Sequence, residues 1–292
     1  MNSELYFIGV DGGGSRCRVR LESADGTLLA KGQSGPANVM RSLDTACASI
    51  MDATAKAIEA AQLSITTQQI VLCAGLAGAN IASAHQALIA KQLPFKHVHL
   101  ISDLHAACAG AHAGNDGAVI VCGTGSSATR YASGSFTDFG GHGFPIGDKA
   151  SGAWLGLQAV KHCLLAFDGL APKDATFNAV CEHLQTNSAE DIVRECAGFN
   201  SNDYAAIVLP LLPLYRKGDS VIQGFVQDGL GYLQRLADEV LNTPDMALCL
   251  IGGLTDLYHP MLSNAVQDRI QPCQLSPDEG AILLAKQAGD YQ

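Results

Sequence analysis

Residues 8–15 read IGVDGGGS, an apolar run that ends in one aspartate and three consecutive glycines. The run is typical of a buried β-strand, and residues 16–21 behind the glycines are typical of a strand that returns beside it. Glycines at the tip of such a hairpin leave main-chain N–H groups uncovered, so several of them can point at one anion. We therefore predict a phosphate site at this tip.

The same pattern returns near the middle of the chain, where residues 119–126 read VIVCGTGS and a second returning strand follows. Two hairpins with glycine tips, one opening each half, predict two related lobes. The boundary is placed in the polar turn GNDG at residues 114–117, which gives lobes of residues 1–116 and 117–292. The last helix is expected to pack back on the first lobe.

Short apolar runs alternate with longer helical patterns, which is typical of an α/β fold with a mixed sheet and helices on both of its faces. Residues 43–61 carry a clear helical pattern, because apolar side chains recur every three or four residues and Ser42 stands at the N-cap position. The strand-like runs are residues 6–10, 70–74, 98–101, 118–122 and 247–251, and the further helical patterns are residues 82–93, 103–113, 151–166, 221–242 and 278–288.

The composition of the 292-residue chain excludes several classes of protein. With 48% hydrophobic and 16% charged residues, the chain is globular and not disordered. The formal net charge of -10 argues against general nucleic-acid binding and against a polybasic membrane contact. No apolar stretch approaches the roughly 20 residues of a membrane span, and no basic flank precedes the first apolar run, so we expect a cytoplasmic protein. The ten scattered cysteines, none in a CxxC spacing, are interpreted as small buried side chains.

The aspartate at the head of the first tip suits a divalent cation. Mg²⁺ favours one or two carboxylates together with waters and phosphate oxygens, so Asp11 is predicted to hold Mg²⁺ through water. Ser15, Thr124 and Ser126 add hydroxyl donors at the two tips. An ordinary flexible turn would explain the first tip alone, but a triphosphate clasped by two lobes needs one tip from each. The chain has neither the P-loop pattern with its lysine nor the GxGxxG spacing of dinucleotide-binding proteins.

Asp103 follows an apolar run and precedes a helical pattern, so it lies at the carboxyl end of a predicted strand. A carboxylate there is well placed to accept a proton from a substrate hydroxyl, and the helix dipole is expected to keep it ionised. It could equally cap the helix that follows.

Two further glycine-rich segments are candidates for ligand contact. Residues 140–152 read GGHGFPIGDKASG, and Asp148 within them can accept hydrogen bonds from sugar hydroxyls, although a structural loop is the alternative. In residues 248–255 a predicted strand ends at Gly252 and Gly253, and a purine ring can lie against these glycines. The alternative is a tight connection between the strand and the helix that follows.

These motifs, in this order, resemble those of the sugar-kinase, actin and Hsp70 ATPase superfamily. The likeness is to the branch with N-acetylglucosamine kinase, bacterial glucosamine kinase and the BadF/BadG/BcrA/BcrD ATPases, and it covers essentially the whole chain. The resemblance implies a two-lobed actin-like, ribonuclease H-like fold with a βββαβαβα core in each lobe, closing on ATP, Mg²⁺ and a sugar. It implies that the nucleotide contacts are Asp11, Gly12, Gly13, Gly14, Ser15, Gly123, Thr124, Gly125, Ser126, Gly252 and Gly253.

The resemblance also implies that Asp103 is the catalytic base. The implied sugar contacts are Asn38, Asp103, Thr124, Gly141, His142 and Asp148. His142 stands where N-acetylglucosamine kinases have a tryptophan, and Lys149 and Ala150 stand where glutamate and glycine are common. The choice between N-acetylglucosamine and glucosamine as the substrate therefore stays open. The resemblance leaves open whether the chain forms a homodimer.

The expected function is an ATP-dependent kinase that phosphorylates the 6-hydroxyl of N-acetylglucosamine or glucosamine. One alternative is an ATPase activator subunit of a 2-hydroxyacyl-CoA dehydratase or reductase system, which would bridge two subunits with an iron–sulfur cluster and needs cysteine thiolates at one interface. A sugar-sensing regulator is the least favoured alternative, since it is expected to carry a DNA-binding winged-helix extension.

Overall fold

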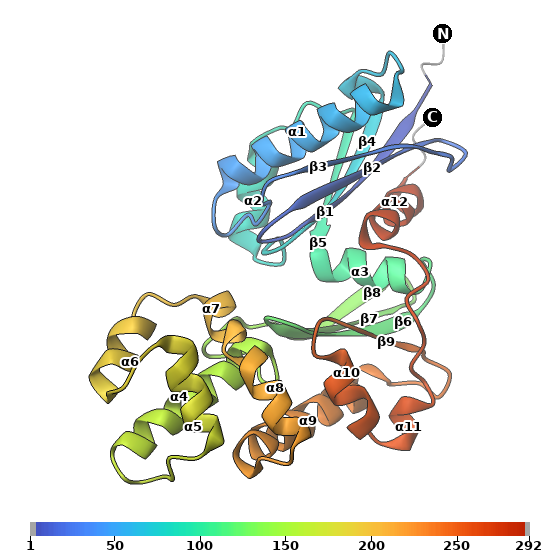
Figure 1. Cartoon of the computed structure of the whole chain (residues 1–292). Coiled ribbons are helices and arrows are strands. Elements are labelled where there is room, and N and C mark those ends of the chain that lie inside the picture. Colours follow the sequence, from blue (N-terminus) through green and yellow to red (C-terminus); the bar gives the residue numbers. More distant parts are fainter. Residues whose placement is uncertain (1–3, 290–292) are drawn as a thin grey trace. The chain divides into compact units, whose positions relative to one another are not determined.

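The computed structural model describes residues 4–289, which form two compact units (Figure 1). The first unit takes in the described residues up to 119, residues 129–137 and the described residues from 272 onward. The second unit takes in residues 120–128 and 138–271. Both units contain strands and helices, so the α/β class predicted from the sequence is confirmed.

The first unit is built on a five-stranded mixed sheet of order β3-β2-β1-β4-β5. Strand β1 runs antiparallel to β2 and parallel to β4, so the hairpin predicted from the first glycine tip is present. The chain order βββαβαβα of this unit agrees with the implied core. Its elements are β1 (Tyr6–Gly12), β2 (Cys17–Ser23), β3 (Leu28–Ser34), α1 (Leu43–Ala61), η1 (Thr67–Gln69), β4 (Ile70–Leu76), α2 (Ala82–Ala90), β5 (His97–Ser102), α3 (Asp103–Ala111) and α12 (Pro277–Ala288).

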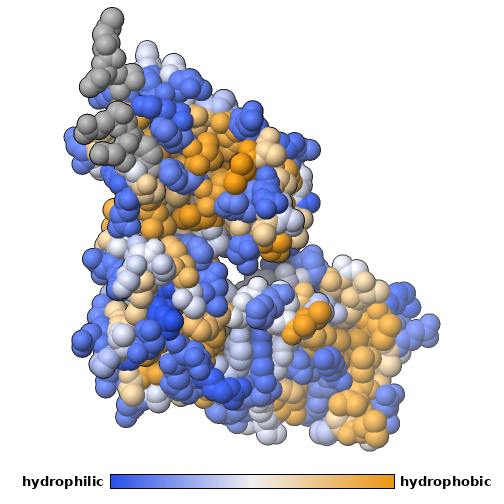
Figure 2. All heavy atoms as spheres, turned by 180° about the vertical axis from the view of Figure 1, so that it is seen from behind, coloured by the Kyte–Doolittle hydropathy of each residue, from blue (hydrophilic) through white to orange (hydrophobic). Residues whose placement is uncertain are grey.

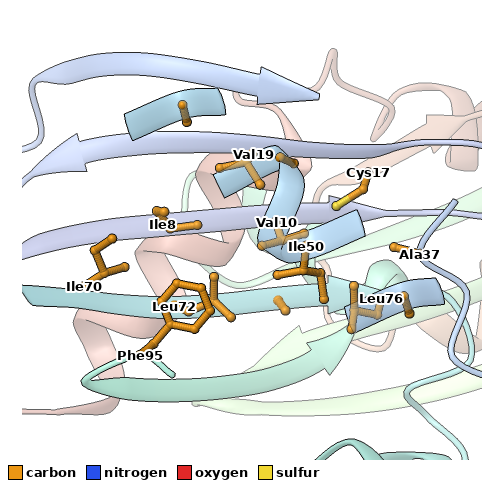
Figure 3. Packing of buried hydrophobic residues seen from close by; sticks show 14 of the residues in the cluster. Ile8, Val10, Cys17, Val19, Ala37, Ile50, Ile70, Leu72, Leu76 and Phe95 are labelled. Atoms are coloured by element: carbon orange, nitrogen blue, oxygen red, sulfur yellow. The ribbon is translucent and has the colours of Figure 1, made fainter. Parts of the chain in front are cut away.

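Successive side chains of the central strands point to opposite faces of this sheet, and both faces are apolar. Ile8 and Val10 of β1 pack in one cluster with Ile50 of α1 (Figure 3). Phe7, the residue before Ile8, points to the opposite face and packs in another cluster with Ile282 of α12. Helix α1 has the predicted bounds, and the Ser42 hydroxyl accepts a hydrogen bond from the main chain at its first turn.

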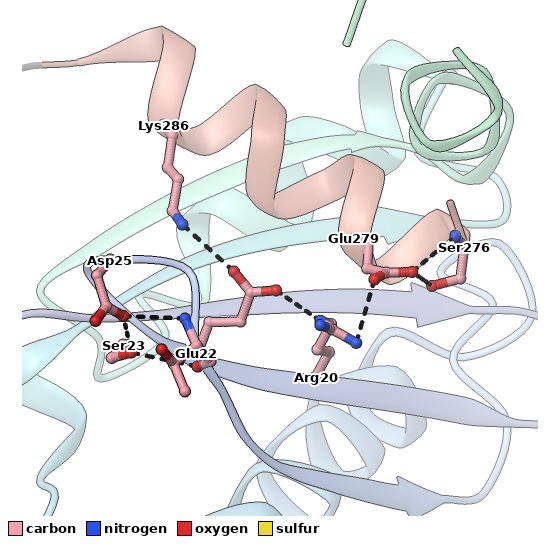
Figure 4. Close-up of polar contacts among 8 residues, drawn as sticks. Arg20, Glu22, Ser23, Asp25, Ser276, Glu279 and Lys286 are labelled. Carbon is pink, nitrogen blue, oxygen red and sulfur yellow. Dashed lines mark hydrogen bonds and ion pairs between the residues drawn. The ribbon is translucent and has the colours of Figure 1, made fainter. Parts of the chain in front are cut away.

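Helix α12 lies directly on the backbone of β1. A Cβ atom added to Gly9 would be 1.9 Å from the carbonyl oxygen of Asp278, so no side chain fits there. Arg20 of β2 forms ion pairs with Glu22 at 2.6 Å and with Glu279 of α12 at 3.3 Å (Figure 4). Lys286 binds Glu22 from the other end of the helix. Close packing and a charged network together fix the first turn of α12 on the sheet.

The second sheet has four strands within the described residues, in the order β8-β7-β6-β9. They are β6 (Gly117–Cys122), β7 (Ser126–Ala132), β8 (Ser135–Gly140) and β9 (Leu248–Ile251). The implied fifth strand is reduced to a single parallel bridge between Leu248 and Ile270, which corrects the expectation of a full βββαβαβα core in the second half. Pro272 follows at once and has no N–H group with which to continue the ladder.

Eight α-helices and one 3₁₀ helix complete the second unit, within residues 138–271. The sequence predicted α4 and α9, but it did not predict the shorter helices, whose apolar patterns are brief and in one case contain Pro213. The elements are α4 (Gly152–Phe167), α5 (Ala175–Leu184), α6 (Ala189–Cys196), α7 (Ser201–Ala206), α8 (Val208–Arg216), α9 (Ser220–Val240), α10 (Thr255–Tyr258), η2 (His259–Met261) and α11 (Asn264–Gln267).

On the surface, hydrophobic residues gather in patches within a largely hydrophilic face (Figure 2). Within residues 4–289, none of the helices combines the length and the apolar character that crossing a membrane requires.

Candidate functional site

The tip between β1 and β2 offers main-chain donors. The N–H of Gly13 closes the tip on the carbonyl of Arg16 at 2.9 Å. Gly14 and Ser15 are exposed, and their N–H groups donate to no protein acceptor in residues 4–289. Gly12 has a different task, because a Cβ atom there would lie 2.4 Å from the Cδ2 atom of Leu76. The outer part of the tip is therefore free to bind an anion, and its inner glycine is needed for packing.

Asp11 ends the buried part of β1 beside this tip. Its carboxylate accepts a hydrogen bond from Nη1 of Arg18 at 3.2 Å. Burial raises the pKa of Asp11, and the guanidinium of Arg18 opposes that rise. A largely buried carboxylate next to free N–H groups is a suitable donor set for Mg²⁺ that carries phosphate. No motif pointed to Arg18, whose pairing with Asp11 follows from the register of β1 and β2.

The segment with Asn38 is held against the same tip. The N–H of Ala37 donates to the carbonyl of Gly13 at 2.9 Å. The Asn38 side-chain oxygen accepts from the N–H groups of Met40 at 2.9 Å and Arg41 at 3.1 Å. Its oxygen is thus used within the turn, which leaves the side-chain amide as the group that can donate to a ligand hydroxyl.

Asp103 is the first residue of α3 and follows β5 directly. The helix is capped by Ser102, whose hydroxyl accepts from the N–H of His105, so the alternative of Asp103 as the N-cap is wrong. Burial is the main cause that raises the pKa of Asp103, and the charge of Asp11 raises it further. The hydrogen bond from the N–H of Leu104 at 2.9 Å opposes that rise. Burial outweighs this hydrogen bond and moves the pKa of the carboxyl toward the range of a general base. That Asp103 is kept ionised as a base stays a prediction.

The second tip, between β6 and β7, is fixed by the first turn of α4. The N–H groups of Gly152 and Ala153 donate to the carbonyls of Gly123 at 2.7 Å and Thr124 at 3.1 Å. In the described part of the chain, the N–H groups of Thr124 and Gly125 reach no protein acceptor. The hydroxyl of Ser126 donates to the carbonyl of Lys149 at 2.7 Å and so ties the tip to the long loop.

The long loop, residues 141–151, places Asp148 against the second tip. A Cβ atom on Gly125 would lie 2.7 Å from Oδ2 of Asp148, and Oδ1 accepts from the N–H of Gly143 at 3.1 Å. Burial raises the pKa of Asp148. Gly141 is also fixed to the tip, through its N–H to the carbonyl of Ser126, and His142 is exposed.

Lys149, which departs from the implied pattern, has partners of its own. Its ammonium group pairs with Asp228 at 2.7 Å and lies 5.5 Å from the centre of the Trp154 ring. It therefore anchors the loop to α9 and α4.

The two glycines after β9 have separate tasks. Gly252 has a φ of 119°, and a Cβ atom there would lie 2.2 Å from the carbonyl oxygen of Cys122. Gly253 has open space around its Cα and lines a cavity of about 270 Å³. The other lining residues of this cavity are Leu212, Tyr215, Arg216, Leu254, Asp256, Leu257, Pro260 and Met261. Apolar walls with a few polar groups suit a flat heterocycle.

Residues 8–285 match the sequence profile of the BadF/BadG/BcrA/BcrD ATPase family. The chain belongs to this family. It is 30% identical over 283 residues to glucosamine kinase GspK of Vibrio cholerae, covering 96% of this chain and 95% of that one. It is 26% identical over 234 residues to N-acetylmuramic acid/N-acetylglucosamine kinase of Clostridium acetobutylicum, covering 76% and 75%.

A solved structure from Chromobacterium violaceum, assigned as an N-acetylglucosamine kinase, superposes on this chain with a TM-score of 0.88. The two are 26% identical, and the match covers 97% of this chain and 99% of that one. These comparisons confirm the resemblance stated from the sequence. They favour the kinase over the activator alternative, because the matched curated relatives are named as kinases.

Within each unit of this family member, the predicted residues lie close to one another. In the first unit, the tip, Asp11, the Asn38 segment and Asp103 all lie at the carboxyl edge of the parallel strands. In the second unit, the tip contacts both Asp148 and Gly252. No sequence motif points to Arg18 or to the cavity residues Tyr215 and Arg216, which the structure places beside the predicted residues.

Proposed function

We propose that the chain is an ATP-dependent kinase that transfers the γ-phosphoryl group of ATP to the 6-hydroxyl of an amino sugar, N-acetylglucosamine or glucosamine. The observation that carries the proposal is Asp103, a half-buried carboxylate at the carboxyl end of β5 whose pKa is raised by burial and by Asp11. A base for a sugar hydroxyl and a carboxylate for Mg²⁺ thus lie in one unit, beside a tip with free donors.

For the nucleotide, the free N–H groups of both tips are the proposed contacts to phosphate oxygens. Adenine is proposed to enter the cavity beside Gly253, where Tyr215 and Arg216 supply a ring and a guanidinium. Mg²⁺, when bound, would neutralise charge on the phosphates and help to orient them. Asp11 is the proposed residue that holds it.

For the sugar, Asp103 is proposed to accept the proton of the attacking 6-hydroxyl. Asp148 is proposed to accept from other hydroxyls, and the amide of Asn38 to donate to one. Gly141, Thr124 and His142 stay proposed neighbours of the sugar. Phosphoryl transfer needs little covalent work from the protein, so positioning and charge are its main contributions.

The direct test is an ADP-release assay with glucosamine, N-acetylglucosamine, N-acetylmannosamine and glucose. A 6-deoxy analogue of the best acceptor should release no ADP above background, because it lacks the acceptor oxygen. The kinase proposal is wrong if none of the four sugars stimulates ADP release, and the position is wrong if the 6-deoxy analogue is phosphorylated.

Asp103→Asn tests the base. We expect the turnover number to fall roughly 10²- to 10⁴-fold, as for the loss of a general base, with nucleotide binding largely kept. Asp44→Asn is the matched control, since Asp44 is also an aspartate in the first turn of a helix but is exposed. Turnover of Asp103→Asn at the wild-type rate would refute the assignment.

A further inference from the structure

A second buried carboxylate lines the cavity that contains Asp11. This cavity of about 400 Å³ lies in the first unit, and its charged lining residues are Asp11, Arg18, Lys31 and Asp278. Asp278 belongs to the first turn of α12, and only 7% of its surface is exposed. It is close enough to Asp11 for its negative charge to act on that carboxyl group.

The carboxylate of Asp278 has no protein partner. Within residues 4–289 it takes part in no hydrogen bond or ion pair, and neither cation of the cavity pairs with it. Arg18 pairs with Asp11 instead. The Asp278 side chain is largely buried but faces the cavity, and a carboxylate in such a place without a counter-charge points to a cation that binds there.

Asp278 is also not needed to cap its helix. The residue after it, Glu279, accepts from both the N–H and the hydroxyl of Ser276, which completes a capping box. Glu279 also pairs with Arg20 (Figure 4). Two adjacent carboxylates therefore differ sharply: Glu279 has several partners, and Asp278 has none among the residues that the structure describes.

The donor set fits Mg²⁺ with phosphate. Mg²⁺ is held in proteins by one or two carboxylates and fills its remaining positions with waters and phosphate oxygens. Asp11 and Asp278 supply two carboxylates, and Arg18, whose side chain is 53% exposed, can turn from Asp11 toward a phosphate oxygen.

We propose that Asp278 is a second carboxylate anchor, beside Asp11, for the Mg²⁺ that accompanies ATP. This inference rests on the proposed function. It assigns the last helix a direct part in metal binding, in addition to its packing against Gly9.

The test is a titration of the full chain with Mn²⁺ in the absence of nucleotide. Binding is measured from the electron paramagnetic resonance signal of the Mn²⁺ that stays free. We expect Asp278→Asn to weaken Mn²⁺ binding by roughly 10- to 100-fold, the range seen when supporting groups of metal sites are removed. Asp11→Asn should do the same, and Asp278→Glu should keep more of the affinity because it keeps the carboxylate. Glu279→Gln is the matched control, with the same loss of charge one residue away, and should bind Mn²⁺ as the wild type does.

A second readout separates metal binding from a structural role. Mg²⁺ should raise the melting temperature of the wild type and of Glu279→Gln, and this rise should shrink in Asp278→Asn. The inference is overturned if the wild type binds no Mn²⁺, if Asp278→Asn binds it as tightly as the wild type, or if Glu279→Gln loses as much affinity. A chain that binds Mn²⁺ through Asp278 but phosphorylates none of the sugars would overturn the proposed function alone.

Discussion

Replacing each glycine of the pair at 252 and 253 by alanine should separate stability from nucleotide binding. At Gly252 the φ of 119° is unfavourable for alanine, and the added Cβ would stand 2.2 Å from the Cys122 carbonyl oxygen. Backbone strain of about 1–3 kcal/mol and overpacking of about 1–3 kcal/mol together give a loss of roughly 2–6 kcal/mol. That is a large share of the roughly 5–15 kcal/mol that stabilises a folded protein. At Gly253 no atom lies within 4 Å of the added Cβ, so the fold should tolerate it.

Thermal unfolding and ATP kinetics measure the two effects. The melting temperature of Gly252→Ala should fall by roughly 4–24 °C, since 1 kcal/mol is worth about 2–4 °C in a protein of this size. Gly253→Ala should melt like the wild type but show a raised KM for ATP, because its methyl group takes up space in the cavity proposed for the purine. Equal melting temperatures for Gly252→Ala and the wild type would refute the reasoning about the close approach. An unchanged KM in Gly253→Ala would remove the nucleotide from this cavity.

Two further outcomes follow from buried charge. The raised pKa of Asp103 should place the acid limb of kcat/KM above the ordinary aspartate value of 3.8, with activity lost as falling pH protonates the base. N-acetylglucosamine is the substrate to use, since it has no titrating amine, and a limb at or below the ordinary value would contradict the assignment. Arg20→Ala should lower the free energy of unfolding in urea by roughly 2–4 kcal/mol, somewhat less than the full loss of a buried pair, because Glu22 keeps Lys286. Lys56→Ala breaks the exposed ion pair with Asp52 and should lower the free energy of unfolding by less than about 1 kcal/mol. Similar losses for Arg20→Ala and Lys56→Ala would contradict this view of the network.

The sequence predicted those elements whose apolar pattern is regular along the chain itself. The helix over 43–61 has the predicted bounds, because a regular apolar stripe and a serine cap mark it without help from the rest of the fold. Strand β3 was missed, because it is a partly exposed edge strand with polar residues and Gly32, and its pairing with β2 is what holds it. The shorter helices α5 to α8 were missed for a related reason: none of them buries more than three residues, and α7 buries none.

The candidate site shows the same limit at the level of single residues. Gly12 and Gly14 look alike in the sequence, yet one is required by Leu76 and the other is open to solvent. Asp278 and Glu279 are adjacent carboxylates. The bond of Glu279 with Ser276 is local, but its ion pair with Arg20 depends on the tertiary fold, as does the lack of a partner for Asp278 in the described residues. Residue type and spacing locate a candidate site. Which side chains of that site are free to bind a ligand depends on their hydrogen bonds and ion pairs in the folded protein.

The anion binding proposed for the two tips would arise twice from different surroundings. At the first, the carbonyls of Gly12 and Gly13 accept from the N–H groups of Ala77 at 2.8 Å and Ala37 at 2.9 Å. At the second, the corresponding carbonyls accept from the first turn of α4, at 2.7 and 3.1 Å. A free carbonyl oxygen near an anion would repel it, so occupying these acceptors is as important as leaving the neighbouring N–H groups free. A loop in one unit and a helix in the other remove the same repulsion. Selective binding of an anion therefore depends on the residues around a glycine tip and not on the glycines alone.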